Sequence, residues 1–103
     1  MIKIILKYNQ TKIVKVIIKG HAKYDEFGKD IVCAAVSTTV LTTANAIIKI
    51  DPLSLTCLEE ASYLEMIINY HNDITKSLID NMISILKEIK NDYPKHLQIT
   101  KEV

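Results

Sequence analysis

Residues 1–20, MIKIILKYNQTKIVKVIIKG, decide how the chain begins to fold. Two runs rich in isoleucine and valine, Ile2 to Tyr8 and Ile13 to Lys19, flank a short polar stretch at positions 9–11. This pattern is typical of two β-strands joined by a tight turn. We therefore expect a β-hairpin that ends at Gly20.

Alternation in the second of these runs separates its residues into two faces, because successive side chains of a strand point to opposite sides. Val14, Val16 and Ile18 share one face, and we expect this face to point into the core. The other face combines isoleucine with lysine; its members are Ile13, Lys15, Ile17 and Lys19.

The remainder of the chain predicts two helices and three further strands. Asp30 is a good N-cap for an apolar helix from Ile31 to about Ile50, which Pro52 ends. A second helix follows from a stripe of apolar residues at three- and four-residue steps and stops before Pro94. Its apolar residues are Ile74, Leu78, Met82, Ile85, Leu86 and Ile89. The other expected strands are Thr56 to Glu60, Ser62 to Tyr70 and His96 to Thr100.

The order of these elements, ββαββαβ, predicts an α+β fold with a mostly antiparallel sheet packed against two helices. A chain of 103 residues with 49% hydrophobic content is the usual size of one domain, so we expect residues 1–103 to form a single domain. Between Lys23 and Lys29 the sequence is polar and contains Gly28, which predicts a loop.

Charge and composition exclude several classes of function. The net charge is +1, and all 13 basic residues are lysine, so nothing predicts direct nucleic-acid binding. The stretch from Ile31 to Ile48 carries no charge, but its serine and threonine residues favour a helix enclosed by protein over a membrane span. We expect the hydroxyls of Thr38, Thr39, Thr42 and Thr43 to bond back to helical carbonyls.

The two cysteines, Cys33 and Cys57, do not have the number or spacing of a disulfide framework. Reduced thiols are typical of the cytosol. The apolar run at the N-terminus is too short for a signal peptide. We therefore expect a cytoplasmic protein. Cys57 lies in a predicted strand and is most simply a core residue.

His21 and Cys33 are candidates for a catalytic dyad. Cys33 falls in the first turn of the helix that Asp30 caps, where unpaired N–H groups and the helix dipole favour a thiolate. His21, directly after Gly20, is placed to accept the thiol proton and return it to a leaving amine. The N–H groups of Cys33 and Ala34 are candidates for an oxyanion hole.

Several alternatives stay open at this point. Asp30 either caps the helix or orients the His21 ring, and capping is the simpler role. Cys33 is also compatible with ordinary packing, since cysteine is among the most buried residue types. A metal site would recruit His21, Cys33, Cys57 and His71, but these lack the paired spacing of structural zinc sites, and we expect no metal or other cofactor. His71 and His96 lie at element boundaries, where a solvated or capping role is simpler.

One block of the sequence resembles the signature of the ribosomal-processing cysteine protease family, Prp. The block is Gly20-His21-Ala22, then Gly28, then the run from Asp30 to Ser37, DIVCAAVS. The opening hairpin, the closing helix, the Tyr93-Pro94 pair and a final strand also follow the family's layout, so the resemblance covers nearly the whole chain.

This resemblance implies a function and a set of roles. It places the nucleophile on Cys33 and the general base on His21, and it matches Gly20, Asp30 and Ser37 to other functional positions. It implies a homodimeric endopeptidase that removes the N-terminal extension of the large-subunit ribosomal protein numbered twenty-seven, cutting after phenylalanine through a thioester. The segment between His21 and Asp30 would be the family's mobile loop, which settles around the bound peptide.

Two other functions compete with this interpretation. The first is a non-catalytic, ribosome-associated binding module of similar fold, in which the cysteine and histidine are structural. The second is a thiol redox sensor, which would need Cys33 and Cys57 close enough to form a disulfide.

Overall fold

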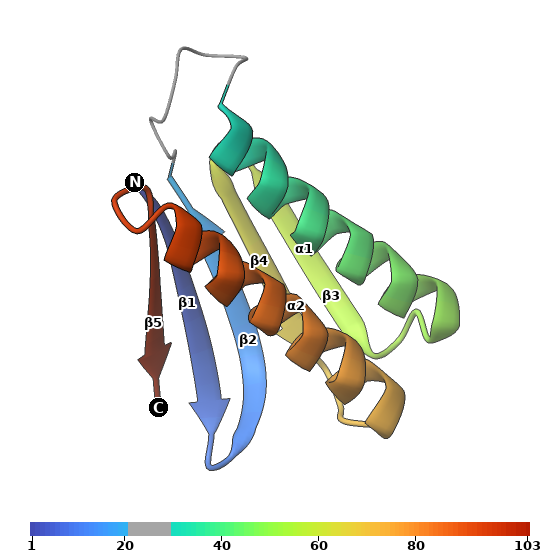
Figure 1. Cartoon of the computed structure of the whole chain (residues 1–103). Helices are drawn as coiled ribbons and strands as arrows, with labels where there is room; N and C mark the ends of the chain where they lie inside the picture. The colour runs from blue at the N-terminus through green and yellow to red at the C-terminus, as the bar shows by residue number, and fades with distance from the viewer. Residues whose placement is uncertain (21–29) are drawn as a thin grey trace.

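The computed structural model describes residues 1–20 and 30–103 (Figure 1). His21 and the predicted loop from Lys23 to Lys29 lie outside the described residues. The elements follow the order ββαββαβ. Their bounds are β1 (Ile2–Asn9), β2 (Lys12–Lys19), α1 (Ile31–Ile50), β3 (Leu55–Glu60), β4 (Tyr63–Ile68), α2 (Asp73–Asp92) and β5 (Leu97–Glu102).

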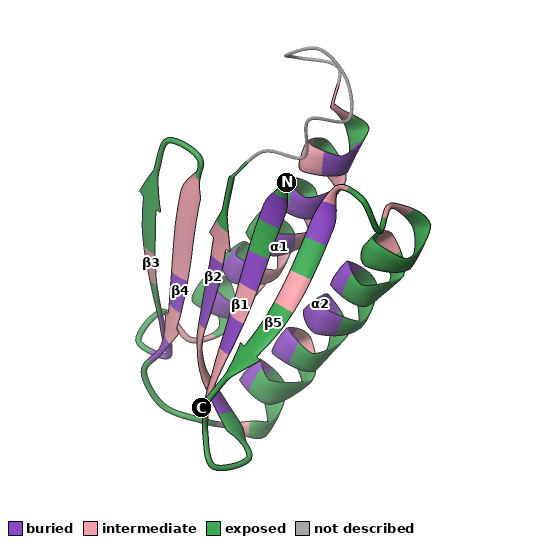
Figure 2. Cartoon of the chain, turned by 90° about the vertical axis from the view of Figure 1, so that its left-hand side faces the viewer, coloured by how far each residue is buried: buried purple, intermediate pink, exposed green. Residues whose placement is uncertain are grey.

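The five described strands form one sheet in the order β3-β4-β2-β1-β5. Three of the four pairings are antiparallel, and the fourth, between β1 and β5, is parallel. Both helices lie against the same face of the sheet (Figures 1 and 2). The predicted fold class, a mostly antiparallel sheet with two helices, is confirmed.

The core fills the space between the sheet and the two helices. Each strand of the central trio places fully buried residues there, such as Leu6 on β1, Val16 on β2 and Met66 on β4. The buried residues of α1 recur at three- and four-residue steps; they are Val32, Val36, Val40, Ala44 and Ile47. Burial of each large side chain stabilises the fold by about 1.5–3 kcal/mol, so this layer holds the start of α1 in place.

One face assignment in β2 is wrong. The pairing of β1 with β2 shifts register between Lys7 and Tyr8, because Lys7 lies opposite Lys15 while Tyr8 lies opposite Ile13. Val14 is therefore the extra residue of a β-bulge, and a bulge reverses the alternation beyond it. As a result Ile13, which is 8% exposed, takes the core-facing position that was predicted for Val14.

The element boundaries differ from the predicted ones by one or two residues. Strand β3 begins at Leu55, β4 ends at Ile68, and β5 extends to Glu102. The turn between β3 and β4 contains Ser62 with a φ of +59°, a left-handed conformation that permits the tight reversal. Strand ends are set by long-range pairing, so local patterns locate them only approximately.

Helix α1 is long and apolar enough by composition to cross a membrane, and 28% of its apolar stretch is buried. Its buried face packs on the sheet, and its other face carries hydroxyls. Thr39 Oγ1 donates to the carbonyl oxygen of Ala35 at 2.8 Å, and Thr43 Oγ1 donates to that of Thr39 at 2.9 Å. The predicted bonding of threonine hydroxyls to helical carbonyls is confirmed at these two positions.

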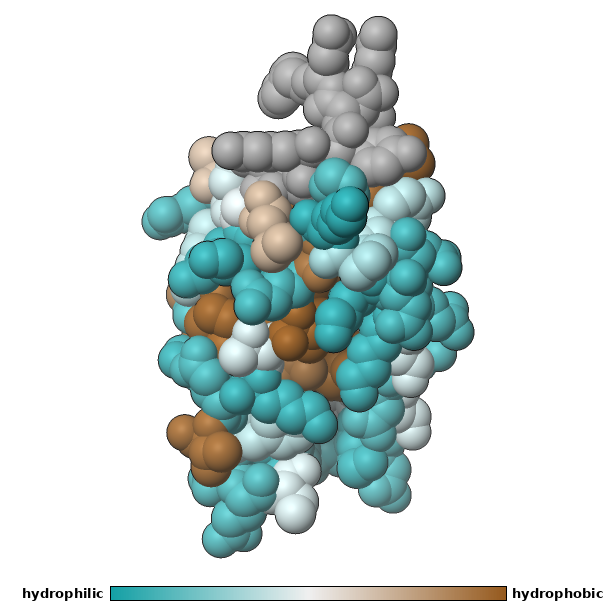
Figure 3. All heavy atoms as spheres, turned by 60° about the vertical axis from the view of Figure 1, so that its left-hand side comes forward, coloured by the Kyte–Doolittle hydropathy of each residue, from teal (hydrophilic) through white to brown (hydrophobic). Residues whose placement is uncertain are grey.

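Large hydrophobic side chains are also exposed at scattered positions of the surface. The most exposed within the ordered elements and their turns are Leu53, Ile74, Ile50, Ile31 and Leu58. Figure 3 shows one face on which hydrophilic residues predominate and hydrophobic ones are visible near the centre. Such scattered exposure is common among soluble domains.

Candidate active site

The N-terminal turn of α1 holds Cys33 in a defined position. Asp30 is the N-cap, with an extended backbone, and its Oδ1 accepts a hydrogen bond from the N–H of Cys33 at 2.9 Å. Cys33 is half-buried and packs against the core cluster. Capping by Asp30 is thereby confirmed, and it places the thiol in the first helical turn, as predicted.

The predicted oxyanion hole needs a correction. The N–H of Cys33 donates to the Asp30 carboxylate, and the N–H of Ala34 donates to the Asp30 carbonyl oxygen at 3.1 Å. Both groups are engaged because an N-cap satisfies the donors of the first turn. The N–H groups of Ile31 and Val32 make no hydrogen bond within the described parts of the chain, so they are the donors left at this helix end.

Gly20, at the end of β2, has a structural reason to be glycine. Its φ is +91°, and a Cβ added there would lie 2.6 Å from the carbonyl oxygen of Met1. Its N–H donates to the carbonyl oxygen of Ser62 at 3.0 Å, which ties the end of β2 to the β3–β4 turn. Gly20 therefore directs the chain into the segment that contains His21.

A cavity of about 150 Å³ lies beside this helix end. Gly20 lines it, as does Ser37, which is exposed and follows Cys33 by one helical turn. Part of its lining comes from the β3–β4 turn, which lies at the same end of the molecule as the start of α1 (Figures 1 and 2). The structure thus brings Gly20 and Ser37 to one cavity. Ala34 instead lines a shallow groove between α1 and α2.

The β3–β4 turn contributes to this end of the molecule in a way that the sequence does not predict. Glu59 and Glu60 line the cavity together with Ser62. The only local signal for them is a pair of adjacent acidic residues at the end of a predicted strand, and such pairs are common on solvated surfaces. Their position next to α1 depends on the pairing of β4 with β2.

Cys57 is half-buried and lies at the edge of the core, not within it as predicted. It lies on β3 opposite Met66 and packs against the core cluster. Burial raises the pKa of the Cys57 thiol, and the nearby Glu59 carboxylate raises it further. A raised pKa keeps this sulfur protonated at neutral pH and lowers its reactivity. Both cysteines are thiols, so the structure contains no disulfide between them.

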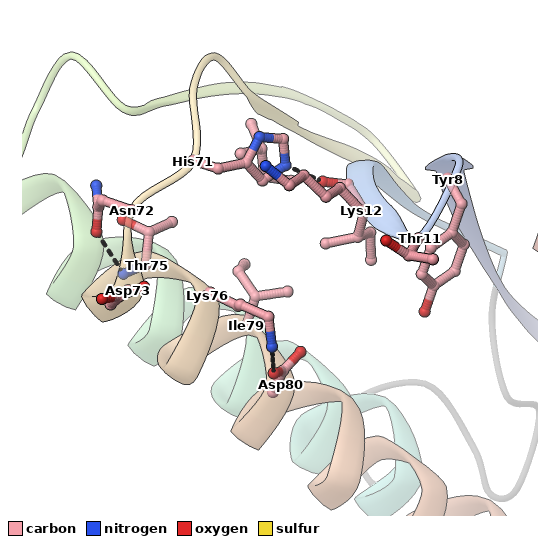
Figure 4. Close-up of a pocket in the computed structure, with 12 residues that line it drawn as sticks. Tyr8, Thr11, Lys12, His71, Asn72, Asp73, Thr75, Lys76, Ile79 and Asp80 are labelled. Atoms are coloured by element: carbon pink, nitrogen blue, oxygen red, sulfur yellow. Dashed lines mark hydrogen bonds and ion pairs between the residues drawn. The ribbon is translucent and has the colours of Figure 1, made fainter.

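His71 lies at the opposite end of the molecule, at a cavity of about 250 Å³ between the β1–β2 turn and the start of α2 (Figure 4). Its Nε2 is 2.8 Å from the carbonyl oxygen of Ile13, to which it donates. Asn72 caps α2 by accepting from the N–H of Thr75 at 2.8 Å. His71 therefore fastens the start of β2 to the loop before α2 and has no place beside Cys33. The backbone carbonyl oxygen of His96 accepts a hydrogen bond from the N–H of Ile2, at the start of β1.

Metal binding finds no support in the described residues. Within residues 1–20 and 30–103, no group of three or more His, Cys, Asp or Glu side chains is placed to hold a metal ion. Cys33, Cys57 and His71 in particular do not form such a group.

Comparison with known proteins places the chain in a class and a family. The family model described as "Cysteine protease Prp" matches residues 1–98. The chain is therefore a cysteine peptidase, a hydrolase that uses a thiol nucleophile. It belongs to the Prp family of cysteine proteases.

Similar proteins from two bacteria agree with this assignment, and a structure from a third shares the fold. The ribosomal processing cysteine protease Prp of Bacillus subtilis is 33% identical over 92 residues, which cover 82% of this chain and 81% of that protein. The crystal structure of the Staphylococcus aureus ribosomal processing protease Prp with a covalently linked product peptide matches with a TM-score of 0.88 and 26% identity, over 99% and 100% of the two chains. A Streptococcus mutans structure with a TM-score of 0.77 and 24% identity, over 99% and 96% of the two chains, shares the fold.

Proposed function

We propose that this protein is a ribosomal processing endopeptidase that removes the N-terminal extension of the large-subunit ribosomal protein numbered twenty-seven, cutting after phenylalanine. In this proposal Cys33 is the nucleophile and His21 the general base. The observation that carries it is the position of the Cys33 thiol, in the capped first turn of α1, in a chain that matches a peptide-bound Prp over its whole length.

The position of Cys33 supports a nucleophilic role in two ways. Its backbone is held by the hydrogen bond to Asp30 and by packing against the core, so the thiol starts from a preorganised position. The helix N-terminus places partial positive charge next to the reacting atoms. The N–H groups of Ile31 and Val32 are donors at this end and are candidates for binding an oxyanion.

Acylation is the first half of the proposed reaction. His21 takes the proton of the Cys33 thiol, and the sulfur attacks the carbonyl carbon of the phenylalanine before the cut. A C–S bond forms, and the negative charge moves to the carbonyl oxygen. When the tetrahedral intermediate collapses, the C–N bond breaks, and His21 gives its proton to the leaving amine. The products of this half are a thioester on Cys33 and the shortened ribosomal protein.

Deacylation is the second half. His21 removes a proton from water, and the oxygen attacks the thioester carbon. The C–S bond then breaks, and the sulfur recovers a proton from His21. The extension leaves as a free carboxylic acid, and the enzyme returns to its starting state.

A cleavage assay tests this function. A peptide that spans the extension of the host's ribosomal protein is incubated under reducing conditions with the wild type, with Cys33→Ala and with Cys57→Ala, and the products are identified by mass spectrometry. We expect one cut after phenylalanine with the wild type and with Cys57→Ala, and none with Cys33→Ala. Intact peptide with every variant, together with a Cys33 thiol inert to alkylation, would instead favour a non-catalytic binding module.

We also propose that the enzyme acts as a homodimer in the cytoplasm. The family resemblance supports the dimer, and ribosomal proteins are processed where ribosomes assemble. Sedimentation equilibrium of the purified chain at micromolar concentration should give twice the monomer mass of 11.7 kDa. A single species of monomer mass at all concentrations would contradict this proposal.

A further inference from the structure

The cavity beside the start of α1 lies one helical turn from the proposed nucleophile, because Ser37 lines it. It is bordered by Ser37 and Leu41 on α1 and by Gly20 at the end of β2. Ser37 is one helical turn from Cys33 and Leu41 is two turns away, or about 6 and 12 Å along the helix axis. An extended peptide covers this span in roughly two to four residues. A peptide bound at Cys33 can therefore reach the cavity with a neighbouring side chain.

The lining of this cavity divides into an apolar part and an acidic part. The apolar part consists of half-buried or buried side chains; these are Ile18, Val36, Val40 and Leu64. The acidic part is formed by Glu59 and Glu60, which are both exposed and precede the β3–β4 turn.

The two carboxylates have no counter-ion among the described residues. Glu65, on the neighbouring strand, is paired with Lys15 at 3.6 Å and accepts a hydrogen bond from Tyr63 at 3.1 Å. Neither Glu59 nor Glu60 forms an ion pair within residues 1–20 and 30–103.

The negative potential of this acidic part also acts on its neighbours. The Glu59 carboxylate adds to the effect of burial in raising the pKa of Cys57. The pKa of Tyr63 is raised by desolvation and by Glu65, with a further contribution from Glu60. Negative charge at the mouth of an apolar cavity favours a cationic group there.

We propose that this cavity is a specificity subsite that binds a lysine or arginine side chain of the peptide substrate, a few residues from the scissile bond. The inference rests on the proposed function, because it assumes a peptide held at Cys33. The cationic head group contacts Glu59, which lies opposite Leu64 on β4, and the aliphatic stem lies against Ile18 and Leu64.

The physical basis is the amphipathic character of a long basic side chain. Lysine and arginine bury their methylene stems on apolar surface while the charged end stays at the solvent boundary. A cavity of about 150 Å³ has room for one such side chain. A small apolar side chain would leave the Glu59 carboxylate unpaired, and an acidic one would be repelled, so the site discriminates by charge.

Cleavage kinetics with matched peptides test the subsite. The peptides have the sequence of the processed region, and each basic residue near the cut is replaced in turn by norleucine, which keeps the stem and removes the charge. They are assayed with the wild type, with the double variant Glu59→Gln/Glu60→Gln, and with Glu102→Gln as a control at the end of β5. Circular dichroism confirms that each variant is folded.

We expect one norleucine peptide to show a kcat/KM about tenfold below that of the parent, mainly through KM, which is the effect of losing one charge-assisted hydrogen bond. With the parent peptide, the double variant should show a kcat/KM about tenfold below that of the wild type. With that norleucine peptide, the double variant and the wild type should have the same kcat/KM. Glu102→Gln should behave as the wild type. Equal kcat/KM for all peptides with the wild type, or an equal loss for all peptides with the double variant, overturns the subsite.

Binding measurements separate failure of the subsite from failure of the proposed function. Fluorescence anisotropy of the same peptides is measured with Cys33→Ala, with and without Glu59→Gln/Glu60→Gln. If no peptide is cleaved but the charge-dependent binding is present and is lost in the Gln variants, the protease function is wrong and the subsite stands. Binding that does not depend on the basic residue overturns the subsite whether or not the peptide is cleaved.

Discussion

Replacement of Asp30 by alanine tests the role of the cap at the proposed active site. The substitution removes the carboxylate that accepts from the N–H of Cys33 at 2.9 Å and exposes one donor of the first turn. Loss of an N-cap costs about 1 kcal/mol, and loss of a negative charge at a helix N-terminus costs about 0.5 kcal/mol more. Together these lower the free energy of unfolding by about 1.5 kcal/mol, or the Tm by roughly 6–12 °C for a domain of this size.

Two further variants make this prediction specific. Asp30→Asn keeps a capping oxygen, so it should lose only about 0.5 kcal/mol, the part due to charge. Asn72→Ala removes the equivalent cap of α2, which accepts from the N–H of Thr75 at 2.8 Å at the far end of the molecule, and should cost about 1 kcal/mol. Urea unfolding followed by circular dichroism measures all three. If Asp30→Ala is as stable as the wild type, the cap does not stabilise α1 and the reasoning fails.

Activity of the same variants decides between the two roles considered for Asp30. If Asp30 only caps the helix, Asp30→Asn should retain nearly all of the wild-type kcat/KM in the peptide cleavage assay, and Asn72→Ala should retain all of it. A loss of 100-fold or more in folded Asp30→Asn would mean that the carboxylate acts on the reaction itself, for example by orienting His21.

Three other predictions follow from single positions. Gly20→Ala places a Cβ 2.6 Å from the Met1 carbonyl oxygen at a φ of +91°, so thermal unfolding should show a loss of at least about 1–2 kcal/mol, and unchanged stability would contradict the described end of β2. Cys57 should react with iodoacetamide more slowly than Cys33 at pH 7–8 and speed up only as the pH rises, because burial and Glu59 raise the Cys57 pKa; peptide mapping measures both rates, and faster labelling of Cys57 would refute this. Met66→Ala should lower the free energy of unfolding by about 2–5 kcal/mol because Met66 is fully buried. Ile74→Ala should lower it by less than about 0.5 kcal/mol because Ile74 is 56% exposed. Equal losses in urea unfolding would show that Met66 does not lie in the core.

Local sequence was sufficient for the elements and for the start of the candidate site. The apolar runs of the hairpin and Asp30 before a long apolar helix depend on residues close together in the chain. The predicted apolar stripe of α2 is wrong in part, because Ile74 and Ile85 are exposed and the buried face instead contains Ile79 and Ile83. The cap on the N–H of Cys33 is a contact between residues three apart, so it was predictable from spacing. The GHA and DIVCAAVS segments carried the family resemblance that the comparisons confirm.

Tertiary structure decided what depends on long-range pairing. The parallel pairing of β5 with β1 and the bulge at Val14, which buries Ile13, follow from how strands meet and not from any local pattern. The pairing of β4 with β2 brings the β3–β4 turn to Gly20 and so places Glu59 and Glu60 at a cavity beside α1. Helix caps and turns are determined by interactions between near neighbours, whereas sheet order and cavities are determined by the burial of apolar surface from the whole chain, and only the folded structure shows how that burial is distributed.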